Sequence, residues 1–128
     1  MGDHLLFVYG KLRKGGALPM DENFPGATFV GNATVQGKLY DLGRFPGLVM
    51  NGSESKVLGA VYTVDDATLQ QLDEIEASAE YYRQLKDAFV GDEQITCWIY
   101  LPNSQQCTED KLIASGDWIE HSRSRGEQ

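Results

Sequence analysis

The sequence has few cysteines, few histidines and no long hydrophobic run, and each shortage narrows the class of protein. Two cysteines, Cys97 and Cys107, and two histidines occur among 128 residues. They form no spaced group of metal ligands, so we expect no metal site. No segment approaches the roughly 20 apolar residues that cross a bilayer, and the apolar run at residues 5–8 is too short for a signal peptide. These absences predict a cytoplasmic protein with reduced cysteines.

Positive charge is also scarce. The chain has 11 Lys and Arg against 19 Asp and Glu, which gives a formal net charge of −8. Because an acidic surface repels phosphate backbones, we expect no nucleic-acid partner. What is present, 41% hydrophobic residues and 14 glycines, is typical of a globular chain with many turns. The length fits one domain, which we place at residues 1–120, followed by a polar C-terminal tail at 121–128.

The patterns of apolar residues and turn signals predict more strands than helices. The predicted strands span residues 5–8, 28–33, 34–40, 57–64, 81–90 and 94–101. The predicted helices span residues 17–24 and 65–76, with a short helical turn within 111–118. Alternation in the last strand places Cys97 in the core, and it puts Trp98 and Tyr100 on a face that is either core or interface. Strands joined by hairpins favour an α+β fold with a mostly antiparallel sheet or barrel.

The first strand and the turn that ends it form the first candidate site. The apolar run at residues 5–8 is typical of a strand buried on both faces. Tyr9 then closes the strand, and Gly10 has access to backbone angles that are closed to other residues. Such a turn exposes its amides and is a common place for a small-molecule site. The alternative is that Gly10 only makes a tight turn and Tyr9 is only a core residue.

The helix predicted from Asp65 or Asp66 to about Glu76 carries the second candidate. At about 100° per residue, Leu69, Leu72 and Ile75 mark an apolar arc about 120° wide. Glu76 falls about 20° inside one edge of this arc, whereas Asp73 lies about 40° outside it. A carboxylate aimed at the interior is costly unless it is paired, hydrogen-bonded or protonated. Burial also raises its pKa toward the range of a general acid or base near neutral pH.

Three alternatives remain open for this acid. The helix can end before Glu76, which then faces water. Glu76 can instead form a structural ion pair with Arg83, since both lie near the junction between this helix and the next strand. Finally, Glu80 follows four residues later and is a rival acid if the register of helix and loop differs from the one assumed.

Four short motifs, spread over nearly the whole chain, resemble signatures of the gamma-glutamylcyclotransferase-like superfamily. In chain order they are Tyr9-Gly10-Lys11-Leu12, residues 37–43 with Phe45-Pro46-Gly47, Gly59-Ala60-Val61-Tyr62, and Leu72-Asp73-Glu74-Ile75-Glu76 followed by Tyr82 and Arg83. The later residues 115–118 are similar to a segment of small bacterial members. Each motif is weak singly, but four motifs in this order make a strong match.

The resemblance implies a fold, an activity and a set of site residues. The implied fold is α+β, with a small mixed, mostly antiparallel β-barrel and a few flanking helices. The implied activity is release of 5-oxoproline from a small gamma-glutamyl amine or amino acid, with no metal or organic cofactor. Carried onto this chain, the family pattern makes Glu76 the general acid/base. It assigns substrate binding to Tyr9, Gly10, Lys11 and Leu12, and a supporting role to Tyr40, Pro46, Gly47, Tyr82 and Arg83.

The chain departs from the family at one position of the first motif. Family members usually have a small hydroxyl residue where this chain has Lys11. Lys11 either reaches the α-carboxylate of the substrate or points to solvent, and we favour solvent. Because some family members lack the acid, the alternative function is a non-catalytic module that binds a small metabolite or a protein in the same pocket. A structural interaction protein without a pocket is a third.

The sequence leaves two properties open. It does not identify the leaving amine, whose subsite we place near residues 44–51 and 102–108. It also does not determine the oligomeric state.

Overall fold

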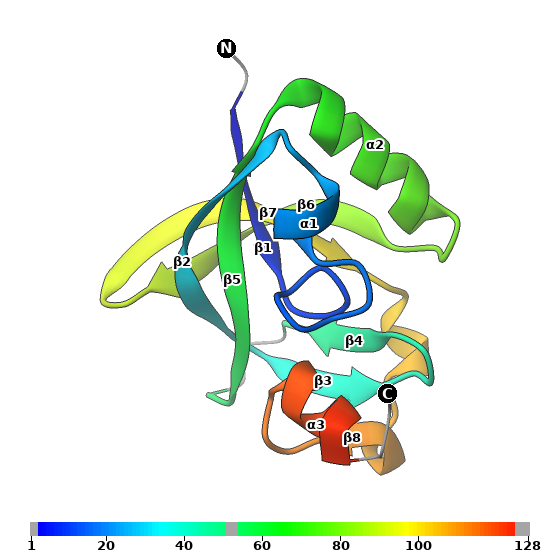
Figure 1. Cartoon of the computed structure of the whole chain (residues 1–128). Coiled ribbons are helices and arrows are strands. Elements are labelled where there is room, and N and C mark those ends of the chain that lie inside the picture. Colours follow the sequence, from blue (N-terminus) through cyan, green and yellow to red (C-terminus); the bar gives the residue numbers. More distant parts are fainter. Residues whose placement is uncertain (1–2, 51–53, 125–128) are drawn as a thin grey trace.

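Five strands close into a mixed barrel at the centre of the molecule (Figure 1). The computed structural model describes residues 3–50 and 54–124 of the chain. The barrel strands, in spatial order, are β1 (His4–Val8), β5 (Lys56–Val64), β2 (Ala27–Gln36), β6 (Tyr82–Val90) and β7 (Glu93–Leu101). Neighbours pair antiparallel except β1 and β7, which pair parallel and close the barrel. The predicted α+β fold with a small, mostly antiparallel barrel is confirmed.

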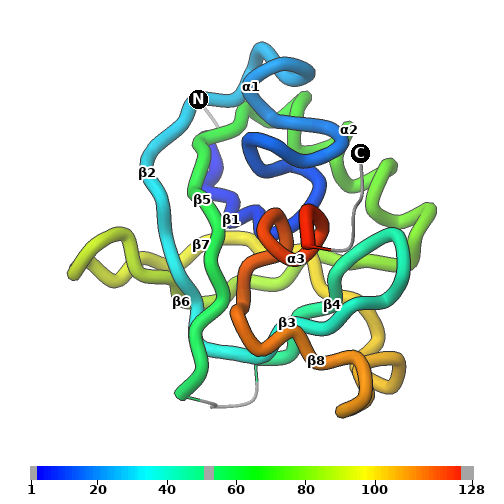
Figure 2. The backbone as a smooth tube through the Cα atoms, turned by 60° about the horizontal axis from the view of Figure 1, so that its bottom comes forward, coloured from blue at the N-terminus to red at the C-terminus, as the bar shows by residue number. Residues whose placement is uncertain are grey.

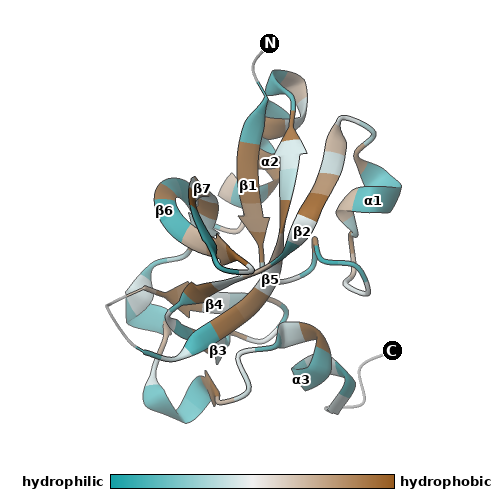
Figure 3. Ribbon diagram, turned by 90° about the vertical axis from the view of Figure 1, so that its left-hand side faces the viewer, coloured by the Kyte–Doolittle hydropathy of each residue, from teal (hydrophilic) through white to brown (hydrophobic). Residues whose placement is uncertain are grey.

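Strand β1 is buried on both faces, as its apolar run predicted. Phe7 packs into one hydrophobic cluster, together with residues of β2, β5 and β7. Leu6 and Val8 pack into a second cluster, which contains Leu69 and Leu72 of helix α2 (Asp66–Ala77). Figure 3 shows that hydrophobic residues fill most of β1 and β5. Because β1 lies between the two clusters, successive side chains of this strand point alternately into one cluster and into the other.

A second, three-stranded sheet lies beside the barrel and consists of β3 (Lys38–Asp41), β4 (Pro46–Val49) and β8 (Leu112–Ile113). The predicted strand at 34–40 is wrong in its bounds, because the chain leaves the barrel at Gly37. A Cβ atom there would lie 2.7 Å from the carbonyl oxygen of Val49, so only glycine allows this close approach. Strand β4 begins at Pro46, although proline and glycine are turn signals in the local sequence.

Helix α2 has the bounds that the sequence predicted. The Asp65 carboxylate accepts a hydrogen bond of 2.8 Å from the Thr68 amide and caps the helix. Helix α1 (Met20–Asn23) is shorter than the predicted 17–24. Helix α3 (Trp118–Ser124) crosses the boundary that we had placed before residue 121 (Figure 2), and residues 125–128 lie outside the described part. Trp118 of α3 is buried in the same cluster as Leu39 and Leu48 of the second sheet.

Two further predictions concern the core and the membrane. Cys97 is 1% exposed and packs into the first cluster, which confirms its core position. Tyr100 is buried and Trp98 packs partly against the same cluster as Tyr100, so this face of β7 belongs to the core. In the described ranges, none of the helices has the length and apolar character needed to cross a membrane.

Candidate active site

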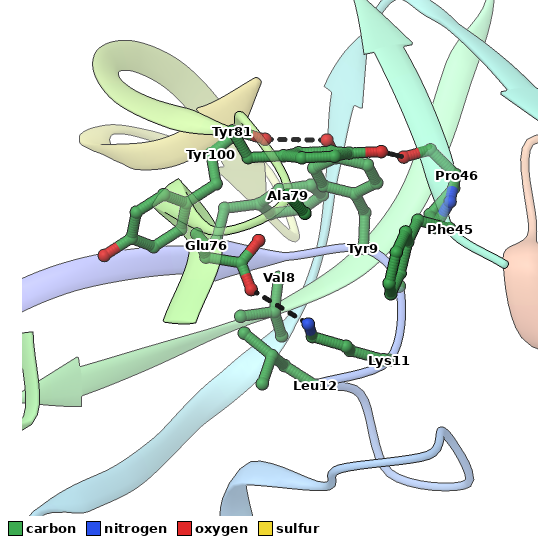
Figure 4. Close-up of a pocket in the computed structure, with 12 residues that line it drawn as sticks. Val8, Tyr9, Lys11, Leu12, Phe45, Pro46, Glu76, Ala79, Tyr81 and Tyr100 are labelled. Atoms are coloured by element: carbon green, nitrogen blue, oxygen red, sulfur yellow. Dashed lines mark hydrogen bonds and ion pairs between the residues drawn. The ribbon is translucent and has the colours of Figure 1, made fainter. Parts of the chain in front are cut away.

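A pocket opens where β1 ends, between the last turn of α2 and the loop before β4 (Figure 4). About 450 Å³ of space lies between its walls and at its mouth, where the pocket is open to solvent. Most of its walls are apolar or aromatic. The residues that line it are Phe7, Val8, Tyr9, Gly10, Lys11, Leu12, Phe45, Pro46, Glu76, Ala79, Tyr81 and Tyr100. The first-strand turn and the helix acid, which the sequence had identified separately, therefore share one cavity.

Glu76 is the acid of this pocket. Helix α2 runs to Ala77, so the alternative in which the helix ends before Glu76 is wrong. The residue is 7% exposed, as its place on the apolar arc predicted. Among the described residues, its Oε2 atom accepts no hydrogen bond of good geometry, and its polar contact is an ion pair with Nζ of Lys11 at 3.3 Å. Burial raises the pKa of the carboxyl above its ordinary value, and the nearby charge of Lys11 partly offsets this rise.

The turn after α2 places a pocket wall beside this acid. The amides of Ala79 and Tyr81 both donate to the carbonyl oxygen of Glu76, at 3.0 and 2.9 Å. Glu80 adopts a left-handed conformation with φ of 65° in this turn, and its side chain is exposed. The structure therefore brings Glu76, and not the rival Glu80, into the pocket.

Lys11 points into the pocket, so the prediction that it faces solvent is wrong. Its Nζ atom lies 3.3 Å from Oε2 of Glu76 and 4.9 Å from the centre of the Phe45 ring (Figure 4). The Lys11 side chain is only 21% exposed. The ion pair with a buried carboxylate and the contact with an aromatic face both favour the inward position. Both partners are remote in sequence, so the local pattern around Lys11 gave no sign of them.

Two tyrosines fix the inner wall of the pocket through hydrogen bonds to the backbone. The Tyr9 hydroxyl donates to the carbonyl oxygen of Tyr100 at 2.6 Å, and the Tyr81 hydroxyl donates to that of Pro46 at 2.7 Å. Burial raises the pKa of both phenols, so they stay protonated and donate at neutral pH. Tyr9 is therefore both a core residue and a wall of the site.

Gly10 is required for close packing rather than for an unusual backbone angle. Its φ is not positive, which contradicts the conformational reason that we gave for this glycine. A Cβ atom at this position would lie 2.7 Å from Cγ and 3.0 Å from Cδ of Pro46. In the described part of the chain, the N–H groups of Gly10, Lys11 and Leu12 donate in none of the backbone hydrogen bonds of the turns and loops. The turn therefore offers these amides at the pocket.

Arg83 binds a different carboxylate from the one considered in the sequence. Its Nε atom donates to Oδ1 of Asp73 at 2.7 Å, and its guanidinium lies 4.2 Å from the centre of the Trp98 ring. The proposed Glu76–Arg83 pair is therefore wrong. The Tyr100 hydroxyl also donates to Asp73, at 2.7 Å. Burial raises the pKa of Asp73, but the hydrogen bonds from Arg83 and Tyr100 outweigh it and lower the pKa overall.

The remaining residues that the sequence singled out are divided between the pocket and its surroundings. Pro46 lines the pocket. Tyr40 and Gly47 are buried in the second sheet, and Tyr82 is 60% exposed. Of the loops predicted to surround the leaving amine, 44–51 contributes Phe45 and Pro46, whereas 102–108 contributes no lining residue in its described part. Asn51 lies outside the described residues.

Several lining residues were not predicted. Ala79, Tyr81 and Tyr100 reach the pocket from two separate segments of the chain, whereas Phe45 lies in the segment 44–51 that we placed near the leaving amine. Tyr81 begins the strand predicted at 81–90, and that prediction did not indicate that its side chain lines a pocket. Across the described residues, no group of three or more His, Cys, Asp or Glu side chains is arranged to hold a metal ion.

Comparison with known protein families shows to which family the chain belongs. The model of the family described as "Gamma-glutamyl cyclotransferase, AIG2-like" matches residues 6–120. This chain belongs to that family. A Vibrio cholerae protein named "Putative gamma-glutamylcyclotransferase" is 39% identical over 91% of this chain and 96% of its own. The Escherichia coli "Gamma-glutamylcyclotransferase family protein YtfP" is 37% identical over 92% of this chain and 98% of its own.

Solved structures from several organisms share the fold. The crystal structure of YkqA from Bacillus subtilis superposes with a TM-score of 0.79 at 28% identity, and it covers 98% of this chain and 44% of the longer YkqA chain. The solution structure of ytfP from Escherichia coli superposes with a TM-score of 0.64 at 35% identity, and the match covers 92% of this chain and 98% of the ytfP chain. A mouse AIG2-like protein, at 22% identity and a TM-score of 0.75, shows the likeness of fold alone, with 92% and 89% covered.

Proposed function

We propose that the protein is a gamma-glutamyl cyclotransferase that releases 5-oxoproline and a free amine from a small gamma-glutamyl amine or amino acid. One observation carries this proposal. Glu76, a buried acid whose Oε2 atom has only the ion pair with Lys11 as a polar contact among the described residues, shares a pocket with the turn amides after β1. The family match supports the same reaction class.

The reaction needs no nucleophile from the protein. The α-amine of the substrate attacks its own γ-carbonyl carbon, a C–N bond forms, and a five-membered ring closes. When the intermediate collapses, the bond from the γ-carbon to the leaving nitrogen breaks. Because both reacting groups belong to one molecule, the pocket mainly has to hold the folded conformer. No covalent enzyme intermediate is required.

Glu76 would move the protons. The α-ammonium loses two protons during the reaction, and the leaving nitrogen gains two, so the carboxylate can carry them in succession as base and then acid. The raised pKa of the buried carboxyl brings it closer to the working pH and favours this double role. The N–H groups of Gly10, Lys11 and Leu12 would stabilise the negative charge that develops on the γ-oxygen. No cofactor takes part in these steps.

The substitution Glu76→Gln tests the proposal. It keeps the size of the side chain but removes the proton acceptor, so we expect turnover to fall by at least ~10²-fold. The assay is 5-oxoproline release from a panel of gamma-glutamyl dipeptides and amines. Glu80→Gln is the matched control, because this exposed acid lies four residues away and outside the pocket. Equal product release by wild type and Glu76→Gln would refute the role of Glu76.

A non-catalytic binding module is the second candidate, and one observation favours it. Lys11 already forms an ion pair with the only carboxylate among the described pocket residues. If this pair persisted when ligand bound, the acid would not be free to take a proton. Saturable binding of the dipeptide panel without any 5-oxoproline would support this alternative.

A further inference from the structure

We propose that Lys11 selects substrates that carry a free α-carboxylate. When such a substrate binds, Lys11 leaves its ion pair with Glu76 and forms an ion pair with the α-carboxylate instead. This inference rests on the proposed function, since it assigns the group that holds one end of the gamma-glutamyl moiety. It gives a role to the position at which the chain departs from the usual small hydroxyl residue of the family.

The geometry of the ion pair matches the head group of an amino acid. Nζ of Lys11 and Oε2 of Glu76 lie 3.3 Å apart. In an α-amino acid, the bond lengths and angles place the ammonium nitrogen about 2.7–3.6 Å from the carboxylate oxygens, depending on the torsion about the bond from Cα to the carboxyl carbon. The two opposite charges of the pocket therefore have nearly the spacing of the two opposite charges of the substrate. An antiparallel arrangement places the α-carboxylate on Lys11 and the α-ammonium on Glu76.

The pocket offers few partners for the two charges of the substrate. Among the described lining residues, Lys11 is the only cationic side chain and Glu76 the only carboxylate. The other side chains are apolar or are tyrosines, and the hydroxyls of Tyr9, Tyr81 and Tyr100 donate to other groups of the protein. A zwitterion that enters these walls loses water on both charges, so it binds well only if both find a partner.

The exchange also prepares the acid. In the empty pocket, Lys11 opposes the rise in the Glu76 pKa that burial causes. When the substrate's carboxylate draws the ammonium of Lys11 away, the substrate's α-ammonium takes its place beside Glu76, so the carboxylate faces the group whose proton it has to accept. The Phe45 ring, 4.9 Å from Nζ, supports the lysine during the shift, because an aromatic face attracts a cation from many directions. A substrate with a neutral α-carboxamide would leave Lys11 on Glu76.

The experiment compares two substrates with the same leaving amine, one with an α-carboxylate and one with an α-carboxamide. We expect wild type to prefer the carboxylate by at least ~10²-fold in kcat/KM. Lys11→Met keeps the stem and removes the charge, and it should lower kcat/KM for the carboxylate by about 10- to 100-fold, mainly through KM. The carboxamide should be affected far less. Lys11→Gln is a second variant if the methionine variant does not fold.

Lys14→Met is the matched control, because Lys14 is an exposed lysine three positions along the same loop and does not line the pocket. It should keep the preference of wild type. If wild type makes 5-oxoproline and the Lys11 variants discriminate as well as it does, the inference is overturned while the proposed function stands.

If no product forms, a binding measurement tests the role of Lys11 independently of the cyclotransferase proposal. Calorimetry would compare L-glutamate with its α-carboxamide, isoglutamine, on wild type and on the Lys11 variants. A preference for glutamate that disappears with the Lys11 charge supports the inference even where the cyclotransferase proposal fails. Equal preference in wild type and variants, or no preference in wild type, overturns it.

Discussion

The substitution Gly10→Ala should destabilise the protein and distort the pocket, because the turn after β1 packs directly on the ring of Pro46. The added methyl carbon would lie 2.7 Å from Cγ and 3.0 Å from Cδ of Pro46, whereas unstrained carbon contacts lie at about 3.5–4.0 Å. The ring must therefore retreat by up to about 1 Å. Overpacking of this kind typically costs about 1–3 kcal/mol.

The displacement of Pro46 should also affect the pocket wall beside Glu76. The carbonyl oxygen of Pro46 accepts the hydrogen bond from the Tyr81 hydroxyl at 2.7 Å, and the amide of Tyr81 donates to the carbonyl of Glu76. A shift of Pro46 therefore loosens the wall beside the acid. We expect kcat/KM for 5-oxoproline release to fall together with the free energy of unfolding, which urea titration measures.

A double-mutant cycle makes the reasoning refutable. Pro46→Ala removes the ring atoms that Gly10→Ala would strike and keeps the carbonyl that Tyr81 binds. The combined variant should be more stable than the sum of the two single effects by about 1 kcal/mol or more, since neighbouring sites couple by roughly 0.5–3 kcal/mol. Additive effects, or a Gly10→Ala variant as stable as wild type, would show that the contact with Pro46 does not restrict this position.

Two further predictions concern groups outside the reaction itself. The lowered pKa of Asp73 means that its ionised form stabilises the fold above the ordinary value near 3.8, and that this contribution is lost as the pH falls through the folded value. Asp73→Asn should therefore lower the urea midpoint at pH 7, with a gap that closes as the pH falls below the ordinary range of an aspartate, and a gap that is constant with pH would contradict the role of the charge. Burial raises the pKa of the Cys97 thiol to about 11, so a thiol reagent at pH 8 should modify Cys97 only after unfolding, which mass spectrometry of the labelled peptide would show.

The elements that depend on local patterns were predictable from the sequence. The apolar run of β1, the cap at Asp65 and the inward face of Glu76 follow from neighbours within a few positions. The carboxylate at position 76 could be placed because a helix repeats every 3.6 residues, roughly, which fixes direction without any tertiary contact. The shared pocket itself followed from the family motifs rather than from periodicity.

The parts that failed depend on contacts between distant segments. The direction of Lys11 is set by Glu76 and Phe45, and the partner of Arg83 is set by the packing of β6 against α2. Strand β4 exists because Pro46 to Val49 pair with β3, although proline and glycine in this segment are locally turn signals. The need for glycine at position 10 likewise arises from Pro46, a residue of a different sheet.

The parallel pairing of β1 with β7 has a consequence for how the chain is made. The Tyr9 hydroxyl binds a carbonyl 91 residues away, so the first strand to leave the ribosome gains its last neighbour only when β7 has been synthesised. Until then, one edge of β1 stays uncovered, and uncovered apolar edges invite pairing with other chains. A nascent chain that stalls before residue 101 would therefore be prone to aggregation, while the complete chain covers the edge within itself.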